Sequence, residues 1–137
     1  MKITRECDYA IRITLMLSGL KDGAIADAGT ISEAQCVPKQ FTLKILRELM
    51  AAGYVKSFKG ARGGYCMNAS PENLTLLDII TAIDGKIAVN ECLECNHSCN
   101  RVTNMADCPV HRQMYTLNTM ITDTLSNVTF AKLLSDC

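Results

Sequence analysis

Four cysteines and a histidine gather in the second half of the chain, in the order Cys92-x2-Cys95-x3-Cys99-x8-Cys108, followed by Pro109-Val110-His111. Thiolates are soft ligands that suit zinc or iron–sulfur clusters, and imidazole can complete either kind of site. A structural zinc site usually shows two tight C-x2-C pairs, whereas only Cys92 and Cys95 form such a pair here. The irregular gaps that follow favour a loop wrapped around a larger inorganic cluster.

Two simpler interpretations of the cysteines are a disulfide framework in a secreted protein and a set of inert buried thiols. The chain begins Met1-Lys2-Ile3-Thr4 without an apolar signal stretch, and no segment approaches the roughly 20 apolar residues of a membrane span. We therefore expect a cytoplasmic protein in which disulfides do not persist. Cys7, Cys36 and Cys66 stand singly among apolar residues, which predicts small buried side chains.

Charge is distributed unevenly along a chain whose net charge is zero. Residues 1–66 contain 10 Lys and Arg against 6 Asp and Glu, whereas residues 67–137 contain 4 against 8. The positive excess lies between residues 39 and 62, a pattern typical of a phosphate-binding surface. With 137 residues, 48% of them hydrophobic, the chain has the size and composition of one globular domain plus an appendage.

The first half of the chain predicts a helix-turn-helix. One helix is expected over residues 7–18, and a second runs from Asp27 as N-cap to about residue 35. After a tight turn, Pro38 begins a third helix that ends at Gly53. Its apolar stripe is Phe41, Ile45, Leu46 and Leu49, and we expect Lys39, Gln40 and Lys44 on its other face to approach base edges or phosphates.

A basic, glycine-rich hairpin is expected directly after the third helix. Residues 54–58 alternate as a strand does, residues 59–64 form a turn, and residues 65–67 return. On its own such a tip is an ordinary soluble turn, but behind a helix-turn-helix it indicates a wing. We expect Lys59, Arg62 and Gly63 at a minor groove or a phosphate.

The second half predicts a long helix behind the cysteine segment. Thr75 caps a helix over residues 76–84, and residues 86–108 form an irregular loop. From Pro109 to about residue 126, apolar residues at steps of three and four make a narrow seam of the kind that packs on a partner helix. A short capped helix with a hydrophobic staple follows at residues 128–133.

The expected fold is therefore mainly α with a small β-hairpin. It comprises a winged helix-turn-helix DNA-binding domain at residues 1–85 and a cysteine-rich cluster-binding loop at 86–108. A dimerisation helix and a C-terminal short helix occupy residues 109–137.

These segments together resemble the winged-helix regulators that include the iron–sulfur cluster regulator IscR and the nitric-oxide-responsive repressor NsrR. The wing segment is the most specific part of the resemblance, which covers nearly the whole chain. It rests on Asp8-Tyr9-Ala10, Val37-Pro38-x2-Phe41, Ala52-Gly53-Tyr54-Val55, Lys56-Ser57-x2-Gly60-x2-Gly63-Gly64-Tyr65, Pro71-Glu72-x2-Thr75-Leu76 and Cys108-x2-His111.

The resemblance implies a homodimer with one cluster per subunit, bound by Cys92, Cys99 and Cys108. The fourth ligand is His111 if the chain follows IscR-like members, which suits [2Fe–2S]. It is Asp8 of the partner subunit if the chain follows NsrR-like members, which accompanies [4Fe–4S]. Cys95 is additional to this set, and is either an alternative to Cys92 or a resolving thiol.

The function expected from the resemblance is that of a dimeric transcription regulator, a repressor or redox sensor whose iron–sulfur cluster sets its affinity for a palindromic operator. Nothing in the chain resembles a nucleophile with its base, a P-loop or paired catalytic carboxylates, so we expect neither an enzyme nor a small-molecule substrate. One alternative is a zinc- or thiol-switched DNA-binding regulator. The other is an iron–sulfur electron carrier or cluster-delivery protein.

Overall fold

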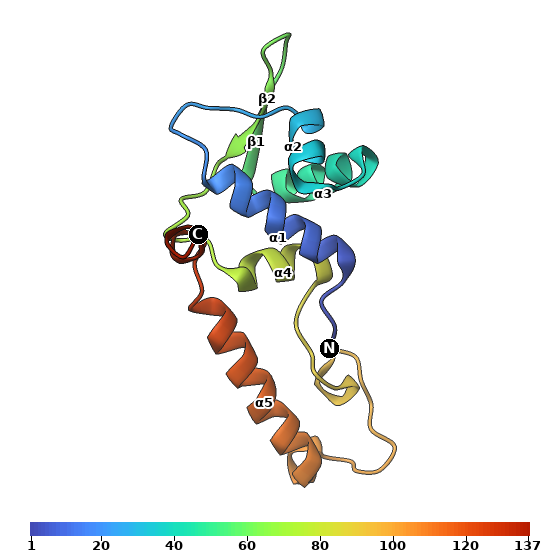
Figure 1. Ribbon diagram of the computed structural model, residues 1–137. Helices are drawn as coiled ribbons and strands as arrows, with labels where there is room; N and C mark the ends of the chain where they lie inside the picture. The colour runs from blue at the N-terminus through green and yellow to red at the C-terminus, as the bar shows by residue number, and fades with distance from the viewer.

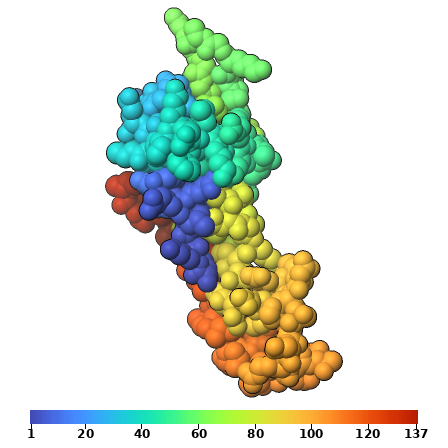
Figure 2. Space-filling model, turned by 90° about the vertical axis from the view of Figure 1, so that its right-hand side faces the viewer, coloured from blue at the N-terminus to red at the C-terminus, as the bar shows by residue number.

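The computed structural model describes residues 1–137 as an elongated molecule with a winged head and a helical stem (Figure 1). The hairpin projects at one end, and the cysteine segment lies beside the long helix at the other (Figures 1 and 2). Its elements are α1 (Arg5–Ser18), α2 (Ala28–Gln35), α3 (Lys39–Ala51), β1 (Val55–Phe58), β2 (Gly64–Met67), α4 (Leu76–Asp84), η1 (Glu91–Leu93), η2 (Met105–Asp107), α5 (Pro109–Ser126) and α6 (Phe130–Ser135).

Side-chain caps fix where four of the helices begin. Thr4, Asp27, Thr75 and Thr129 each accept a hydrogen bond from a backbone N–H of the first turn that follows. Each such cap stabilises a helix by about 1 kcal/mol. The cap at Thr4 starts α1 at Arg5, two residues earlier than the sequence predicts. The expected capping box at Thr75 is present in full.

The turn between α2 and α3 is tight, as the sequence predicts, but differs in two details. Pro38 is the N-cap of α3, and the helix itself begins at Lys39. Cys36 has a left-handed backbone with φ of 53° and an exposed side chain, so the prediction that it is buried is wrong. A residue in this conformation ends α2, which turns its side chain outward.

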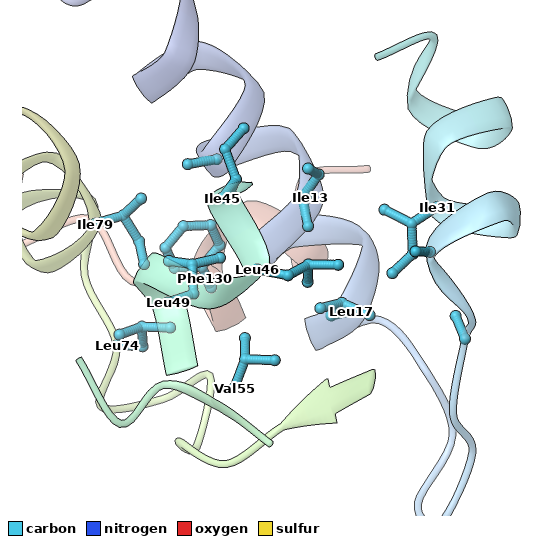
Figure 3. Close-up of a cluster of buried hydrophobic side chains, with 13 residues drawn as sticks. Ile13, Leu17, Ile31, Ile45, Leu46, Leu49, Val55, Leu74, Ile79 and Phe130 are labelled. Atoms are coloured by element: carbon cyan, nitrogen blue, oxygen red, sulfur yellow. The ribbon is translucent and has the colours of Figure 1, made fainter. Parts of the chain in front are cut away.

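The head has one continuous apolar core, to which every α-helix except α5 contributes (Figure 3). Phe130 of α6 is fully buried among Leu46, Leu49 and Leu74, so the chain returns to the head after α5. Two backbone hydrogen bonds secure this return, from Phe130 N–H to the Leu74 carbonyl at 2.9 Å and from Leu76 N–H to the Val128 carbonyl at 3.0 Å.

One position of the predicted α3 stripe is wrong. Phe41 is 41% exposed, whereas its neighbour Thr42 is completely buried. The buried face therefore follows the spacing 42, 45, 46 and 49, which is a regular helical stripe. The hydroxyl of Thr42 donates to the Pro38 carbonyl at 3.3 Å, and this hydrogen bond lets a polar residue occupy the core position.

The wing is an antiparallel pair in which Val55 faces Met67 and Phe58 faces Gly64. The loop before α2 lies against β2, because Ala26 and Tyr65 exchange two backbone hydrogen bonds of 3.0 and 2.7 Å. A Cβ on Gly64 would approach the Ala26 carbonyl oxygen to 2.7 Å, so glycine permits this contact. The mainly helical fold with one hairpin, predicted from the sequence, is confirmed.

The stem helix α5 buries none of its residues. Near its C-terminal end Leu125 packs on Cys7, Ile80 and Ile87 in a small second cluster. The remainder exposes large apolar side chains, at 50% for Val110, 63% for Tyr115, 47% for Leu117 and 60% for Met120. None of the helices is both long and apolar enough to cross a membrane.

Candidate functional site

One side chain of the stem attaches the start of the cysteine segment. The amide of Asn118 on α5 donates to the Ile87 carbonyl at 3.2 Å, and its oxygen accepts from the Val89 N–H at 3.0 Å. One side chain thus satisfies a donor and an acceptor at the start of the loop. The short helices η1 and η2 also lie against α5. This anchoring sets where the following Cys92 leaves the stem.

Two of the four loop cysteines accept a hydrogen bond at sulfur, and a third stands at the start of α5. The Asn90 side-chain amide donates to the Sγ of Cys92 at 3.3 Å. The backbone N–H of Arg101 donates to the Sγ of Cys99 at 3.4 Å. Hydrogen bonds from the backbone N–H groups of Arg101 and then Val102 lower the pKa of the Cys99 thiol. Cys108 is the N-cap residue of α5, and its side chain makes no cap hydrogen bond.

His111 lies in the first turn of α5. Its Nδ1 is buried and has no hydrogen-bond partner, and an unpaired imidazole nitrogen of this kind is available as a ligand. All eight cysteines are free thiols, and Cys95 is exposed. A thiol with a lowered pKa, a thiol at a helix N-terminus and an unpaired imidazole form a donor set that fits an iron–sulfur cluster chemically.

The donors do not converge within the single chain. The structure contains no group of three or more His, Cys, Asp or Glu side chains placed to hold one metal ion. Binding a cluster or a zinc ion therefore requires these side chains to come closer together than they are. Because the segment from 94 to 104 contains no regular element, its backbone can make that change without breaking a helix.

Asp8, the alternative fourth ligand, lies on the first helix in an ion pair. Its carboxylate is 3.2 Å from the guanidinium of Arg12, one turn further along. Arg12 also donates to the Gln35 carbonyl at 3.1 Å, at the last residue of α2. Its guanidinium stacks over the Tyr9 ring at 4.8 Å, and Tyr9 in turn meets Phe41 of α3 edge-on at 6.5 Å. Asp8 is thus connected to the helix-turn-helix through one arginine.

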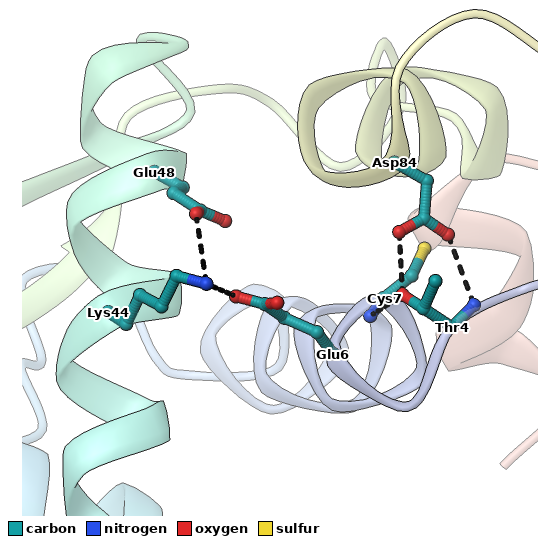
Figure 4. A network of polar contacts seen from close by, with 6 residues as sticks. All are labelled: Thr4, Glu6, Cys7, Lys44, Glu48 and Asp84. Atoms are coloured by element: carbon teal, nitrogen blue, oxygen red, sulfur yellow. Dashed lines mark hydrogen bonds and ion pairs between the residues drawn. The ribbon is translucent and has the colours of Figure 1, made fainter.

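The N-terminal end of α1 also contacts the last residue of α4, just before the cysteine segment (Figure 4). The Thr4 hydroxyl donates to the Asp84 carboxylate at 2.6 Å, and the Thr4 backbone N–H donates to it at 3.1 Å. The Cys7 thiol lies beneath this contact. Burial, followed by the neighbouring Asp84 carboxylate, raises the pKa of Cys7 to about 12. Cys7 is therefore a structural thiol, as the sequence predicts.

Helix α3, the predicted recognition helix, has two of its three predicted DNA-contacting residues exposed and outside any ion pair. Lys39 and Gln40 are exposed in its first turn. Lys44 instead pairs with Glu6 of α1 at 2.8 Å and lies 3.9 Å from Glu48 (Figure 4). These contacts raise the pKa of Lys44, chiefly through the Glu6 hydrogen bond and charge. Lys44 can reach a phosphate only by leaving Glu6.

The wing tip exposes both of its predicted basic residues. Lys59 and Arg62 are exposed, and neither takes part in an ion pair. Gly63 is required by space, because a Cβ there would collide with the Phe58 carbonyl oxygen. The tip therefore has a closely packed backbone with free cations, a combination suited to a narrow, negatively charged groove.

Sequence reasoning missed Asn118, Arg12, Glu6 and Asp84 as contributors to these sites. Their partners lie far away in the chain, at separations of 29 and 31 residues for Asn118 and 80 residues for Asp84. Single polar residues on amphipathic helices carry no local signal of such contacts. Only the helical spacing of Asp8 and Arg12 could have indicated their ion pair.

Comparison with known proteins identifies regulators of transcription. The profile of the Rrf2 family, described as an iron-dependent transcriptional regulator, matches residues 3–136. The regulator NsrR of Bacillus subtilis is 25% identical over 96 residues, which cover 70% of this chain and 66% of NsrR, just under two thirds. The regulator IscR of Vibrio vulnificus is 28% identical over 136 residues, which cover 99% of this chain and 79% of IscR.

The fold itself is shared with a solved regulator of another kind. CymR, the global cysteine regulator of B. subtilis, superimposes with a TM-score of 0.81 at 24% identity, covering 100% of this chain and 98% of CymR. At this identity the likeness shows the fold alone. It also means that the architecture does not select between cluster-based and other signals.

Proposed function

The chain belongs to the Rrf2 family of transcriptional regulators, and from this premise we propose that it is a dimeric DNA-binding protein whose DNA affinity is set by an iron–sulfur cluster. The observation that supports the proposal best is the division of the molecule. Soft donors lie on a loop at one end, and free cations lie on α3 and the wing at the other. Helix α1 contacts both parts, because Cys7 packs with Ile87 at the start of the loop and Glu6 pairs with Lys44 of α3. An enzyme has no need of this separation.

The residues that would hold the cluster are Cys92, Cys99 and Cys108, with either His111 or Asp8 of the partner subunit as the fourth. When bound, such a cluster supplies sensitivity to iron supply, oxygen or nitric oxide. Backbone N–H groups at Cys99 stabilise its thiolate, and the unpaired Nδ1 of His111 accepts a further bond at no cost to existing contacts.

The Arg12 guanidinium connects the possible cluster ligand Asp8 with the helix-turn-helix formed by α2 and α3. In this structure the Asp8 carboxylate shares that guanidinium with the Gln35 carbonyl. If Asp8 serves as a ligand, its charge is withdrawn from Arg12, which then relies on Gln35 and the Tyr9 ring. The contact of Arg12 with the end of α2 then changes, and with it the support of the turn that leads into α3. This route operates only with Asp8 as fourth ligand.

The stem supplies the dimer contact in this proposal. Tyr115, Leu117 and Met120 expose apolar surface on a helix of 18 residues, none of which is fully buried in its own chain. Packing this face against a second copy removes that surface from water. Two recognition helices are then held in a fixed relation, as binding to half-sites about 34 Å apart requires.

The first test is a visible absorption spectrum of anaerobically purified protein, together with iron, acid-labile sulfide and zinc analysis. The same samples are then titrated into fluorescent duplexes obtained by selection from random DNA, with and without the cluster. We expect a coloured protein with matched iron and sulfide, and a DNA affinity that changes when the cluster is removed.

Two other results would redirect the assignment. A colourless protein that holds zinc, or that holds no metal after reconstitution yet binds DNA, indicates a zinc- or thiol-switched regulator. A coloured protein that selects no DNA indicates an electron carrier or a cluster-delivery protein. The spectrum and the titration fail independently, so the two halves of the proposal are tested separately.

A further inference from the structure

A cleft lies at the root of the wing, away from the cysteine segment. Its volume is about 800 Å³, and its walls are the loop between α1 and α2, the outer face of the hairpin and the segment that follows β2. The loop and the hairpin are joined only by the backbone pair of Ala26 and Tyr65. Of its lining, the proposed function uses only Arg62.

The cleft combines free positive charge with exposed apolar surface. Lys21, Lys56 and Arg62 line it, and none of them takes part in an ion pair. Phe58 and Ile25, also in its lining, are 48% and 36% exposed. Lys56 and Phe58 stand two residues apart on one face of β1, with the lysine Nζ 5.8 Å from the ring centroid.

The two acidic residues of the lining do not cancel these cations. Glu72 is held by the Ser70 hydroxyl, which lowers the pKa of the carboxyl, and it makes no ion pair. Asp22 makes no ion pair either. Three cations against two acids leave an excess of positive charge beside the exposed side chains of Phe58 and Ile25.

We propose that this cleft binds a small anionic molecule with a planar apolar body, and that this ligand competes with DNA for Arg62. Small-molecule sites usually measure roughly 300–1000 Å³, a range that includes the volume of this cleft. The planar body would lie on Phe58 and Ile25, whose surface is otherwise wetted. The anionic group would meet Lys56 and Arg62, which have no other counter-charge.

Arg62 connects this cleft with DNA binding. The same guanidinium lines the cleft and belongs to the exposed wing tip. A ligand that holds it towards the wing root removes it from a DNA groove, and bound DNA must weaken the ligand by the same factor. Ligand binding stands without the proposed function, whereas the competition rests on it.

The test uses the fluorescent probe 8-anilinonaphthalene-1-sulfonate, which combines aromatic rings with one negative charge. Purified full-length protein is titrated with the probe, and methyl resonances of Ile25 and Val110 are followed by NMR to locate it. We expect saturable binding that shifts Ile25. Lys56→Gln should weaken binding about tenfold, the value of one charge-assisted contact.

Matched variants separate the cleft from other binding places. Lys86→Gln removes an exposed lysine outside the cleft and should leave the affinity unchanged. Met120→Gln reduces the apolar face of α5 and should also leave it unchanged. If Lys56→Gln binds as the wild type does, or if the probe shifts Val110 and not Ile25, the cleft is not a ligand site.

Competition is measured with the same probe and double-stranded DNA of arbitrary sequence at low salt. We expect the DNA to displace the probe from the wild-type protein. Probe at a concentration that saturates each protein should weaken DNA binding by the wild type and leave that of Arg62→Ala unchanged. If the probe stays in the cleft while DNA binds, the ligand site stands and the competition is refuted. Absence of DNA binding altogether would instead count against the proposed function.

Discussion

Replacing Asn118 with leucine should release the start of the cysteine segment from the stem. The substitution keeps the size of the side chain but removes both hydrogen bonds, of 3.0 Å to Val89 and 3.2 Å to Ile87. A hydrogen bond contributes about 0.5–1.5 kcal/mol net, and a half-buried backbone group left unpaired costs about 1–3 kcal/mol. Together the local attachment should weaken by about 2–4 kcal/mol, which corresponds to about 30- to 1000-fold faster opening.

Hydrogen exchange at the Val89 amide measures this opening directly. The expected acceleration should be confined to the beginning of the segment, because the amides of the head core have no contact with Asn118. Thr116→Val is the matched control, since the Thr116 hydroxyl bonds only the Arg112 carbonyl of its own helix at 3.0 Å. If Val89 in Asn118→Leu exchanges at the wild-type rate, Asn118 does not anchor the segment and our reasoning about the site fails.

Four further outcomes are expected. Arg62→Ala should weaken DNA binding uniformly across sequences and lower the salt slope by about one, measured by anisotropy titration at several salt concentrations. Cys99→Ala should lose the iron and sulfide of reconstituted protein while its circular dichroism stays that of the wild type. Iodoacetamide at neutral pH should label Cys99 well before Cys7, because thiolate is the reactive form and the pKa is lowered at Cys99 and raised to about 12 at Cys7; peptide mass mapping shows the order. Glu6→Gln should free Lys44 and tighten binding to arbitrary duplex DNA about two- to fivefold, the range for a partly exposed ion pair, and unchanged affinity would show that Lys44 does not reach DNA.

Local signals predicted the elements of this fold well. Asp27 and Thr75 cap their helices as expected, and Gly53 and Gly85 adopt the positive φ of 83° that ends α3 and α4. The wing also follows from its own residues, since Gly63 is required by the Phe58 carbonyl within the same hairpin. These features depend on contacts over a few residues, which a sequence displays directly.

The predictions were wrong or incomplete where burial and contacts depend on residues distant in the sequence. Phe41 and Thr42 are adjacent, and hydrophobicity alone selects phenylalanine for the core, whereas the orientation of α3 buries threonine. Cys36 was expected to be buried because it stands among apolar residues in the sequence, but its left-handed backbone turns the side chain outward. For the cysteine segment, the sequence indicated the donors but not their anchor, because the Asn118 contacts span about thirty residues.

The first turn of α1 is the element through which the two ends of the molecule can affect each other within one chain. Thr4 bonds Asp84 at the end of α4, just before the cysteine segment, and Glu6 pairs with Lys44 on α3 (Figure 4). Asp8 pairs with Arg12, which reaches the end of α2. All three residues lie between the N-cap and the fourth residue of α1, so a displacement of this end of the helix strains all three contacts together. A change of the cysteine segment that pulls on Asp84 would therefore alter both the freedom of Lys44 and the support of α2.

For this reason a Thr4→Val variant should change DNA affinity even though Thr4 lies far from the wing, and its effect should be lost in a background that already carries Glu6→Gln. Additive effects of the two substitutions on the anisotropy titration would show that the contacts act separately.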